Sequence, residues 1–221
     1  MKNSFLIMVY MVAVTAFAQQ SAEGSKKYND AESNAILKDL QVKLNSYSSI
    51  VIDFVLQSEK DSKITDEMRG NIKVKGTKYM LSTQIQQVYC DGATVWNYLP
   101  EQKEVNIAYY SEEDDSQMIN PLALVKNYTK QYKSNFIKES YNKGVLEQII
   151  DLTPLKASSL YKVRLVIDKN KKQILRIVLH DKDGTQYTYV VAKFQTNLPI
   201  EDKNFVFDTA KHADVEVIDM R

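Results

Sequence analysis

Few residues in this sequence have types and spacings that belong to a catalytic or metal-binding site. The chain contains no nucleophilic-serine, zinc-protease, paired-cysteine or phosphate-loop motif. Its two histidines, His180 and His212, lie near a predicted hairpin and in a predicted terminal loop. Histidine is a general acid–base group and a common metal ligand, but a solvated or structural role is favoured here. We therefore expect no catalytic residue, no metal and no cofactor, and a protein that is not an enzyme.

Three other groups of side chains allow chemical interpretations of their own. Cys90 is the single cysteine, so an internal disulfide is excluded, and we expect it to be an apolar residue at a strand end rather than a reactive thiol. The run Asp181–Gly184 begins like a calcium loop but lacks the glutamate of one, which predicts a turn. The acidic run Glu112–Asp115 is interpreted as a solvated helix start, or alternatively as a contact for a basic partner.

The only tryptophan lies in the stretch "CDGATVWNYLPEQKEV", which runs from Cys90 to Val105. Trp96 and Tyr98 are two residues apart, so they share one face of a strand and Asn97 points to the other. Because asparagine faces water more readily, we expect Trp96 and Tyr98 to point inward. Periodicity alone leaves open whether Trp96 is an ordinary core residue or lines a cavity.

The first residues predict the cellular location of the protein. Lys2 is followed by an uncharged apolar run, Ser4–Ala18, which ends in a small-x-small pattern. We interpret residues 1–18 as a secretory signal peptide cleaved after Ala18. A membrane anchor is the alternative, although a spanning helix needs about 20 apolar residues. Cleavage leaves residues 19–221, which we expect to form a single domain in the periplasm.

The charge of the mature chain is balanced. Of 29 Lys and Arg residues, Lys2 belongs to the signal peptide, which leaves 28 against 28 Asp and Glu. Net charge near zero gives no reason to expect nucleic acid or an anionic membrane as a partner. We expect the protein to be a monomer.

Two helices are predicted from hydrophobic periodicity. The first covers residues 29–47, can begin at a cap on Asp30 or Ser33, and has an apolar stripe made of Ile36, Leu37, Leu40, Val42 and Leu44. The second lies near residues 118–131, with Pro121 at a plausible first position, and presents Leu122, Leu124, Val125 and Tyr128.

The rest of the chain alternates between apolar and polar residues at the period of a strand. Residues 50–57 place Ile50, Ile52, Phe54 and Leu56 on one face. More than ten such segments follow at intervals of roughly 8–12 residues, separated by Gly, Asp-Gly or Pro. Asp183-Gly184 and the run that begins at Asp168 predict hairpins. We therefore predict a mainly β (α+β) fold, a curled antiparallel sheet.

Two short helices are too small to fill the space that a curled sheet of this size can enclose. A curled sheet can enclose a space that side chains need not occupy. We expect a half-open barrel whose helices cover an apolar cavity that binds apolar ligands. A structural or interaction barrel with a filled core is the alternative, and bound lipid or an apolar dye would separate the two.

The tryptophan stretch also resembles the central motif of the LolA family, the periplasmic carriers of outer-membrane lipoproteins. The matching positions are Asp91, Gly92, Trp96, Tyr98, Pro100 and Val105. Other parts resemble the family in order: the signal peptide, the first helix, residues 53–57, the helix at Pro121, residues 152–154 and the closing residues 204–219. The resemblance covers nearly all of the mature chain.

This resemblance implies an unclosed antiparallel barrel with a helical lid and an apolar cavity. It implies that the acyl chains of lipoproteins are received from an inner-membrane lipoprotein-releasing transporter and passed to an outer-membrane acceptor. A carrier of another lipid or apolar ligand is the alternative. We expect the acyl-chain cavity to be lined by Ile52, Phe54, Leu56, Trp96, Tyr98, Val105 and Ile107. We expect the lid to contain Leu37, Leu40, Leu122 and Val125.

The sequence departs from the family pattern at two places. Many members have an Arg-Pro pair on the strand before the tryptophan motif, and that arginine helps to hold the lid closed. Here Gly76-Thr77 stands in its place. Residues 208–214 replace the usual Pro-Gly before the last strand. We therefore expect a divergent member whose lid is held differently.

Overall fold

The structure is a computed structural model that describes residues 30–111, 125 and 128–221. The signal-peptide prediction, the acidic run at 112–115 and Leu122 lie outside the described residues. The elements in chain order are α1 Ala31–Asn45, β1 Ile50–Lys60, β2 Lys63–Lys75, β3 Lys78–Thr83, β4 Gln87–Cys90, β5 Thr94–Leu99, β6 Glu104–Tyr109, β7 Tyr132–Asn142, β8 Val145–Pro154, β9 Leu160–Asp168, β10 Gln173–Asp181, β11 Gln186–Thr196, η2 Asp202–Phe205, η3 Thr209–Lys211 and β12 Glu216–Asp219.

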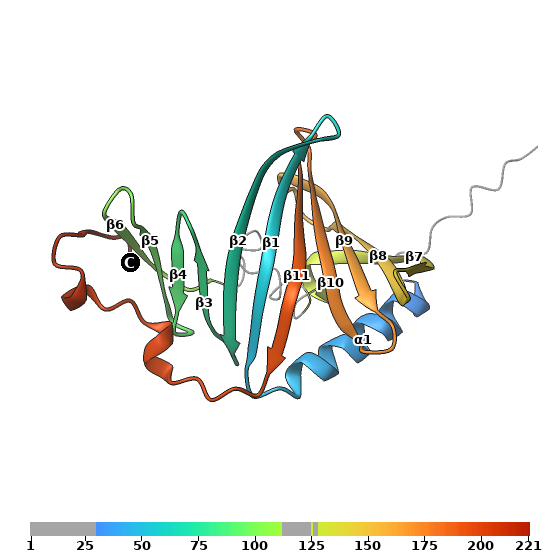
Figure 1. Cartoon of the computed structure of the whole chain (residues 1–221), viewed down its shortest axis with the longest axis horizontal. Coiled ribbons are helices and arrows are strands. Elements are labelled where there is room, and N and C mark those ends of the chain that lie inside the picture. Colours follow the sequence, from blue (N-terminus) through green and yellow to red (C-terminus); the bar gives the residue numbers. More distant parts are fainter. Residues whose placement is uncertain (1–29, 112–124, 126–127) are drawn as a thin grey trace, which may run out of the picture.

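All twelve strands belong to one sheet, in the order β12-β6-β5-β4-β3-β2-β1-β11-β10-β9-β8-β7. Every neighbouring pair is antiparallel except β12, which runs parallel to β6. The strands β12 and β7 form the two ends of this order and do not pair with each other. The sheet is therefore strongly curved but unclosed (Figure 1), which confirms the predicted unclosed antiparallel barrel.

Helix α1 begins where the sequence predicted. The Asp30 carboxylate accepts a hydrogen bond of 2.6 Å from the backbone N–H of Ser33, which satisfies one of the unpaired donors at the helix start. Leu37, Leu40 and Leu44 are buried at a spacing of three and four residues. The prediction that Val42 belongs to this stripe is wrong, because its side chain is 63% exposed.

The second predicted helix is described only at its C-terminal end. Val125 and residues 128–131 are helical. Val125 and Tyr128 are buried in the same hydrophobic core as Leu37 and Leu40 of α1. Both helical segments therefore cover the same face of the sheet, which we call the core face. Within the described residues, no helix is both long and apolar enough to cross a membrane.

The two predicted hairpins join β9 to β10 and β10 to β11. Gly184 has a φ of +88°, which a residue with a side chain rarely adopts. The Asp183 carboxylate accepts hydrogen bonds from both the backbone N–H and the hydroxyl of Thr185, and it pairs with Lys60 at 3.2 Å. These contacts confirm that Asp181–Gly184 forms a turn.

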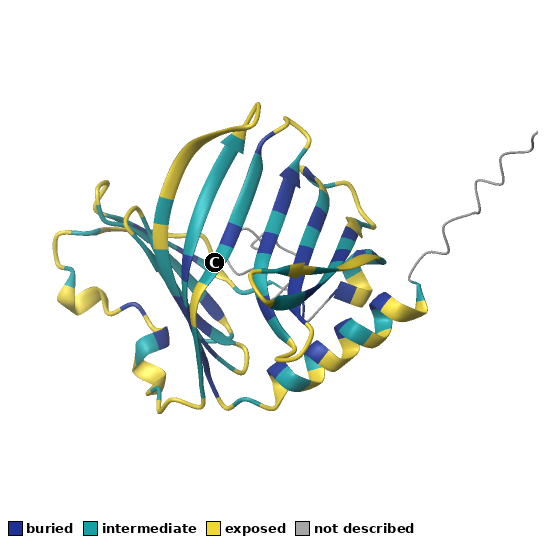
Figure 2. Cartoon of the chain, turned by 45° about the vertical axis from the view of Figure 1, so that its right-hand side comes forward, coloured by how far each residue is buried: buried dark blue, intermediate teal, exposed yellow. Residues whose placement is uncertain are grey.

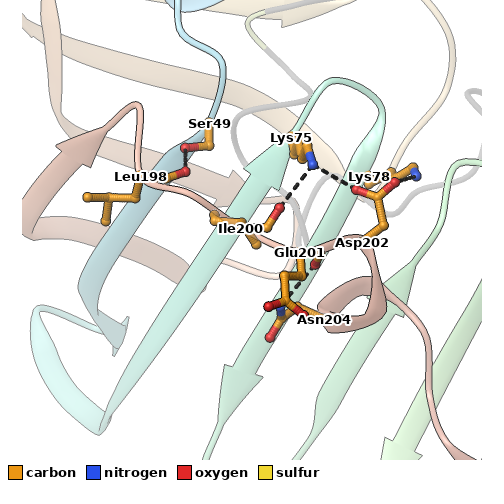
Figure 3. A network of polar contacts seen from close by, with 8 residues as sticks. All are labelled: Ser49, Lys75, Lys78, Leu198, Ile200, Glu201, Asp202 and Asn204. Atoms are coloured by element: carbon orange, nitrogen blue, oxygen red, sulfur yellow. Dashed lines mark hydrogen bonds and ion pairs between the residues drawn. The ribbon is translucent and has the colours of Figure 1, made fainter.

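Residues 197–215, which we call the C-terminal strap, cross the opposite face of the sheet. Asp202 of the strap pairs with Lys75 at 2.8 Å and with Lys78 at 2.7 Å, and Lys75 also donates to the carbonyl oxygen of Ile200 (Figure 3). Phe205 and Phe207 of the strap are buried, and the Phe207 ring packs on Tyr89 and Tyr98 of the sheet. The outer face therefore has an apolar cluster of its own, separate from the core face.

Candidate functional site

The pairing of the strands determines which residues share the core face. Directly opposed residues in neighbouring antiparallel strands place their side chains on the same face. The row of opposed residues that begins at Ile52 continues through Ile72, Leu81, Val88 and Asn97. The first four of these residues are buried in the hydrophobic core, and Asn97 is the fifth residue of the row. Asn97 therefore points to the core face.

Four predicted cavity residues lie on the other face. Trp96 is opposed to Ile107, and Tyr98 is opposed to Val105. These positions alternate with Asn97, so the prediction that they line one cavity with Ile52 is wrong. The C-terminal strap covers their face instead, and the ring centroid of Phe207 lies 5.0 Å from that of Tyr98.

The remaining predicted cavity residues do come together. Ile52 and Phe54 line an apolar hollow on the core face, with Leu56 next along the same face of β1. The hollow has a volume of about 20 Å³, and its other walls are Ile72, Ile174, Ile177, Tyr189 and Val191. Figure 2 shows the buried positions repeating along the strands that flank it. Since ligand sites usually measure about 300–1,000 Å³, this hollow must widen to accept a lipid chain.

Phe54 is placed by a glycine on the neighbouring strand. A Cβ atom added at Gly70 would lie 2.3 Å from the Cζ atom of Phe54, so only glycine leaves room for the ring. The ring also packs against Tyr189, with 5.4 Å between centroids. Burial raises the pKa of Tyr189 to about 12, so its hydroxyl stays neutral. The floor of the hollow is therefore uncharged and shaped by a specific glycine–aromatic contact.

Among the described residues, two polar contacts join the helical segments that cover this face. The side chain of Gln41 on α1 donates a 3.0 Å hydrogen bond to the carbonyl oxygen of Val125. The Tyr128 hydroxyl donates to the side chain of Asn34 on α1, at 3.4 Å. These contacts join α1 to the second helical segment. Leu37, Leu40 and Val125 of the predicted lid are all buried against the core face.

Helix α1 is fixed to the edge of the sheet at its N-terminus. The second carboxylate oxygen of Asp30 accepts a 2.6 Å hydrogen bond from the backbone N–H of Phe136 on β7. The hydroxyls of Ser33 and Ser134 are 2.8 Å apart and hydrogen-bonded. Asp30 thus caps the helix and attaches it to the sheet at the same time.

A second hollow of about 230 Å³ lies beside α1, between the helix and strands β8 and β9. Ile36, Leu40 and Ile167 form its apolar wall, and Lys169 and Lys172 stand at its rim. Lys172 is paired with Asp39 at 2.7 Å, and both side chains are more than half exposed. Because exposed ion pairs contribute little to stability, this side of α1 is only weakly closed.

His180 lies on the outer face, away from the hollow. It is 9% exposed, and within the described residues its Nε2 atom has no hydrogen-bond partner. Burial is the main cause that lowers its pKa from 6.5 to about 4; the nearby cations Lys162 and Arg164 act in the same direction, and Asp151 acts in the opposite direction. His180 is therefore neutral at pH 7 and structural.

The other candidates for chemistry also have structural roles. His212 stacks on Phe207 within the strap, with ring centroids 4.7 Å apart. Cys90 is fully buried at the end of β4, and burial raises the pKa of its thiol. In the described part of the chain, no three His, Cys, Asp or Glu side chains gather in a way that would hold a metal ion.

Comparison with known proteins identifies the family. The family model described as "Outer membrane lipoprotein carrier protein LolA" matches residues 45–208, which is most of the chain. The chain belongs to the LolA family. This assignment agrees with the unclosed sheet and with the two helical segments over one face. Among curated proteins, none matches the sequence.

Solved structures show the same fold at low sequence identity. An uncharacterized conserved protein from Thermus thermophilus is 14% identical, with a TM-score of 0.59, over 85% of this chain and 99% of that one. A LolA superfamily protein from Nitrosomonas europaea is 15% identical, with a TM-score of 0.48, over 80% of this chain and 98% of that one. Of these two structures, only the first has a TM-score above 0.5, and it is the one that supports the fold.

Gly76 stands where the sequence analysis expected the arginine of many family members. Gly76 lies in the turn between β2 and β3, with a φ of +61°, and an added Cβ there would have no neighbour within 4 Å. The hydrogen bonds from Gln41 and Tyr128 join the two helical segments instead. Sequence reasoning missed both, because neither residue type stands out without knowledge of its distant partner.

Proposed function

We propose that this LolA-family protein is a periplasmic carrier that shields the acyl chains of lipoproteins while they pass from the inner to the outer membrane. The observation that carries the proposal is an apolar, uncharged hollow on the core face, beside two helical segments that are packed on that face. Such a face can bind hydrocarbon when the cover moves. The proposed partners are an inner-membrane transporter and an outer-membrane acceptor, and the carrier acts as a monomer without chemistry of its own.

The energetics favour a cover that is displaced rather than a permanently open cavity. Burying one methylene group is worth about 0.8 kcal/mol, so a chain of about 15 methylenes would gain about 12 kcal/mol if it were fully buried. Binding of that strength would be nearly irreversible. A carrier that gives up its own buried contacts to admit the chain keeps only part of this gain. The hollow of about 20 Å³ fits this requirement, because the side chains of the cover occupy the face when no ligand does.

The weakest attachments of the cover indicate how it opens. A hydrogen bond contributes about 1 kcal/mol net, so the two bonds made by Gln41 and Tyr128 contribute about 2 kcal/mol to the contact between the second segment and α1. The attachment of α1 at Asp30 and Ser33 is formed at its first turn. We therefore propose that the second segment separates first, while α1 stays joined to β7 at its N-terminal end.

The small volume of the hollow also favours a second candidate, a structural or interaction protein whose core is filled. A transfer experiment separates the two. The purified protein is added to liposomes that contain a fluorescent triacylated model lipoprotein, and the soluble fraction is separated by size. A carrier releases the lipoprotein as a soluble one-to-one complex. A filled structural protein elutes alone and leaves the lipoprotein in the liposomes, which would refute the carrier proposal.

A matched pair of variants controls for non-specific extraction. Ile177→Asp places a charge in the wall of the hollow and should abolish release. Lys38→Ala, on the exposed side of α1, should leave release unchanged. Circular dichroism of both variants confirms that the sheet is intact.

A further inference from the structure

The second hollow, which we call the side hollow, lies between α1 and the turn that joins β9 to β10. Ala35, Ile36, Leu40 and Ile167 form its apolar wall, and its volume is about 230 Å³. Figure 1 shows the β9–β10 turn beside α1. The side hollow shares no lining residue with the hollow at Phe54. It is therefore a separate site, outside the face to which acyl-chain binding is assigned.

The side hollow has the size of one large side chain. An apolar cavity of about 150 Å³ holds a molecule of benzene, so about 230 Å³ holds a leucine, methionine or phenylalanine side chain. Pockets for larger ligands usually measure about 300–1,000 Å³. The hollow is thus too small for a chain of about 15 methylenes, the length of a lipid tail.

Two exposed ion pairs stand at the rim of the side hollow. Lys172 pairs with Asp39 at 2.7 Å, and Lys169 pairs with Glu139 at 2.7 Å. The side chain of Lys172 is 52% exposed and that of Lys169 is 44% exposed. Since exposed ion pairs are weak, the carboxylate of a partner can replace Asp39 or Glu139 with little loss.

The rim has more positive than negative charge. Lys43, one turn after Asp39 on α1, donates a hydrogen bond to the carbonyl oxygen of Lys171. The Asp168 carboxylate is buried and accepts hydrogen bonds from the backbone N–H groups of Asn170 and Lys171, within the turn itself. The exposed carboxylates of Asp39 and Glu139 are therefore outnumbered by the lysines Lys43, Lys169, Lys171 and Lys172. Such a rim favours an acidic partner.

The helix surface beside the side hollow is partly apolar. Ala35 lines the hollow and is exposed, and Val42, two turns later on the same side of α1, is 63% exposed. Protein interfaces place an anchor side chain in a pocket and surround it with contacts that exclude water. The pocket, its apolar border and its basic rim together match that arrangement.

We propose that the side hollow is a docking site for a polypeptide segment that carries one large apolar side chain beside acidic residues. The apolar side chain fills the space between α1 and Ile167. The acidic residues pair with Lys169 and Lys172 in place of Glu139 and Asp39. An anionic lipid has the required charge, but its tail is too long for the hollow. The inference goes beyond the carrier function and does not depend on it, because the two hollows are separate.

The probe is a short fluorescent peptide with one leucine between glutamates, titrated with the protein and followed by fluorescence anisotropy. Methyl NMR signals of Ile36 and Ile167 locate the bound peptide. The wild-type protein should bind the peptide, and both signals should shift. A peptide with alanine in place of leucine should bind at least about tenfold more weakly, because fewer methylenes are buried. A peptide with lysines in place of the glutamates should not bind.

Four variants test the assignment of the site. Ala35→Phe places a ring in the hollow and should abolish peptide binding. Lys172→Glu reverses a rim charge and should weaken binding about tenfold, whereas Asp39→Asn frees Lys172 and should strengthen binding about twofold. Lys63→Glu is the matched charge reversal at the start of β2, far from α1 (Figure 1), and should change nothing.

The proposal is overturned if the leucine peptide does not bind or if the alanine peptide binds equally well. Equal losses in Lys172→Glu and Lys63→Glu would reduce the binding to general charge attraction and would also overturn it. Vesicles of phosphatidylglycerol that shift the Ile36 and Ile167 signals would assign the site to a lipid surface instead. Should Ala35→Phe lose its circular dichroism spectrum, the two charge reversals decide. Lipoprotein release from liposomes is measured separately, so failure here leaves the carrier proposal unchanged.

Discussion

Replacing Phe54 or Trp96 by glutamate should have opposite consequences, although both are aromatic residues in mid-strand. Phe54 is 4% exposed and lines the hollow on the core face. Trp96 lies on the outer face, since it alternates with Asn97. Phe54→Glu introduces a carboxylate that keeps water in the hollow, and Trp96→Glu does not. Lipid binding should therefore be lost in the first variant and retained in the second.

The magnitude follows from the methylenes that lose their contact. A hydrated carboxylate at Phe54 should exclude about three methylenes, which is about 2.4 kcal/mol or about 60-fold in Kd. Loss of the Phe54 packing should also lower the free energy of unfolding by about 3 kcal/mol. Trp96→Glu should change the Kd less than about twofold, because no acyl chain contacts its face.

The assay is titration of each variant with a fluorescent triacylated peptide, with circular dichroism to show that the sheet is folded. Phe54→Gln is the companion variant, because it is polar but uncharged and should give a smaller loss. Weak binding by Trp96→Glu together with normal binding by Phe54→Glu would refute the assignment of the faces.

Three further changes have definite expected results. Gln41→Ala removes the hydrogen bond to the Val125 carbonyl and should raise the rate of lipid uptake about fivefold in stopped-flow fluorescence; an unchanged rate would exclude that bond as a latch. The pKa of His180 is lowered from 6.5 to about 4, so the unfolded chain binds a proton at a higher pH than the folded chain does. The free energy of unfolding should therefore fall by at most about 3 kcal/mol between pH 6.5 and pH 4. In urea unfolding, His180→Asn should flatten this pH dependence, and an unchanged pH dependence would contradict the lowered pKa of His180. Phe207→Ala removes a buried ring from the strap and should destabilise the protein by about 3 kcal/mol without changing lipid affinity; a loss of affinity would tie the strap to the site.

Local patterns predicted much of the fold. The Asp30 cap, the spacing of Leu37, Leu40 and Leu44, and the hairpin at Asp183-Gly184 all appear in the structure as expected. Each depends on residues within a few positions of one another. Periodicity and turn chemistry therefore predict these features without knowledge of the tertiary structure.

The face of the tryptophan strand could not be predicted in this way. Alternation shows that Trp96 and Tyr98 share a face, but it does not show which face the helices cover. The polarity of Asn97 indicated the wrong one. The deciding partner is Phe207, which lies more than a hundred residues later and packs on Tyr98 through the strap. When both faces of a strand are covered, the sequence of that strand alone does not show which face belongs to the main hydrophobic core.

Only part of the candidate site could be predicted, because some of its contacts join residues that are distant in sequence. Ile52 and Phe54 were assigned to the hollow from alternation within one strand, and the structure places them there. The role of Gly70 and the bond between Gln41 and Val125 depend on pairs that are distant in sequence. Such contacts are determined by strand register and by helix docking, which no single segment encodes.

Binding of acyl chains by the core face is the property on which the proposed carrier function depends. The most direct measurement is native mass spectrometry of the protein purified from its own cells without detergent, followed by chemical identification of whatever is bound. We predict a population whose added mass corresponds to an acylated peptide or lipid and which disappears in Phe54→Glu. A bare polypeptide mass, together with no binding of an apolar dye by the Gln41→Ala variant, would contradict the account.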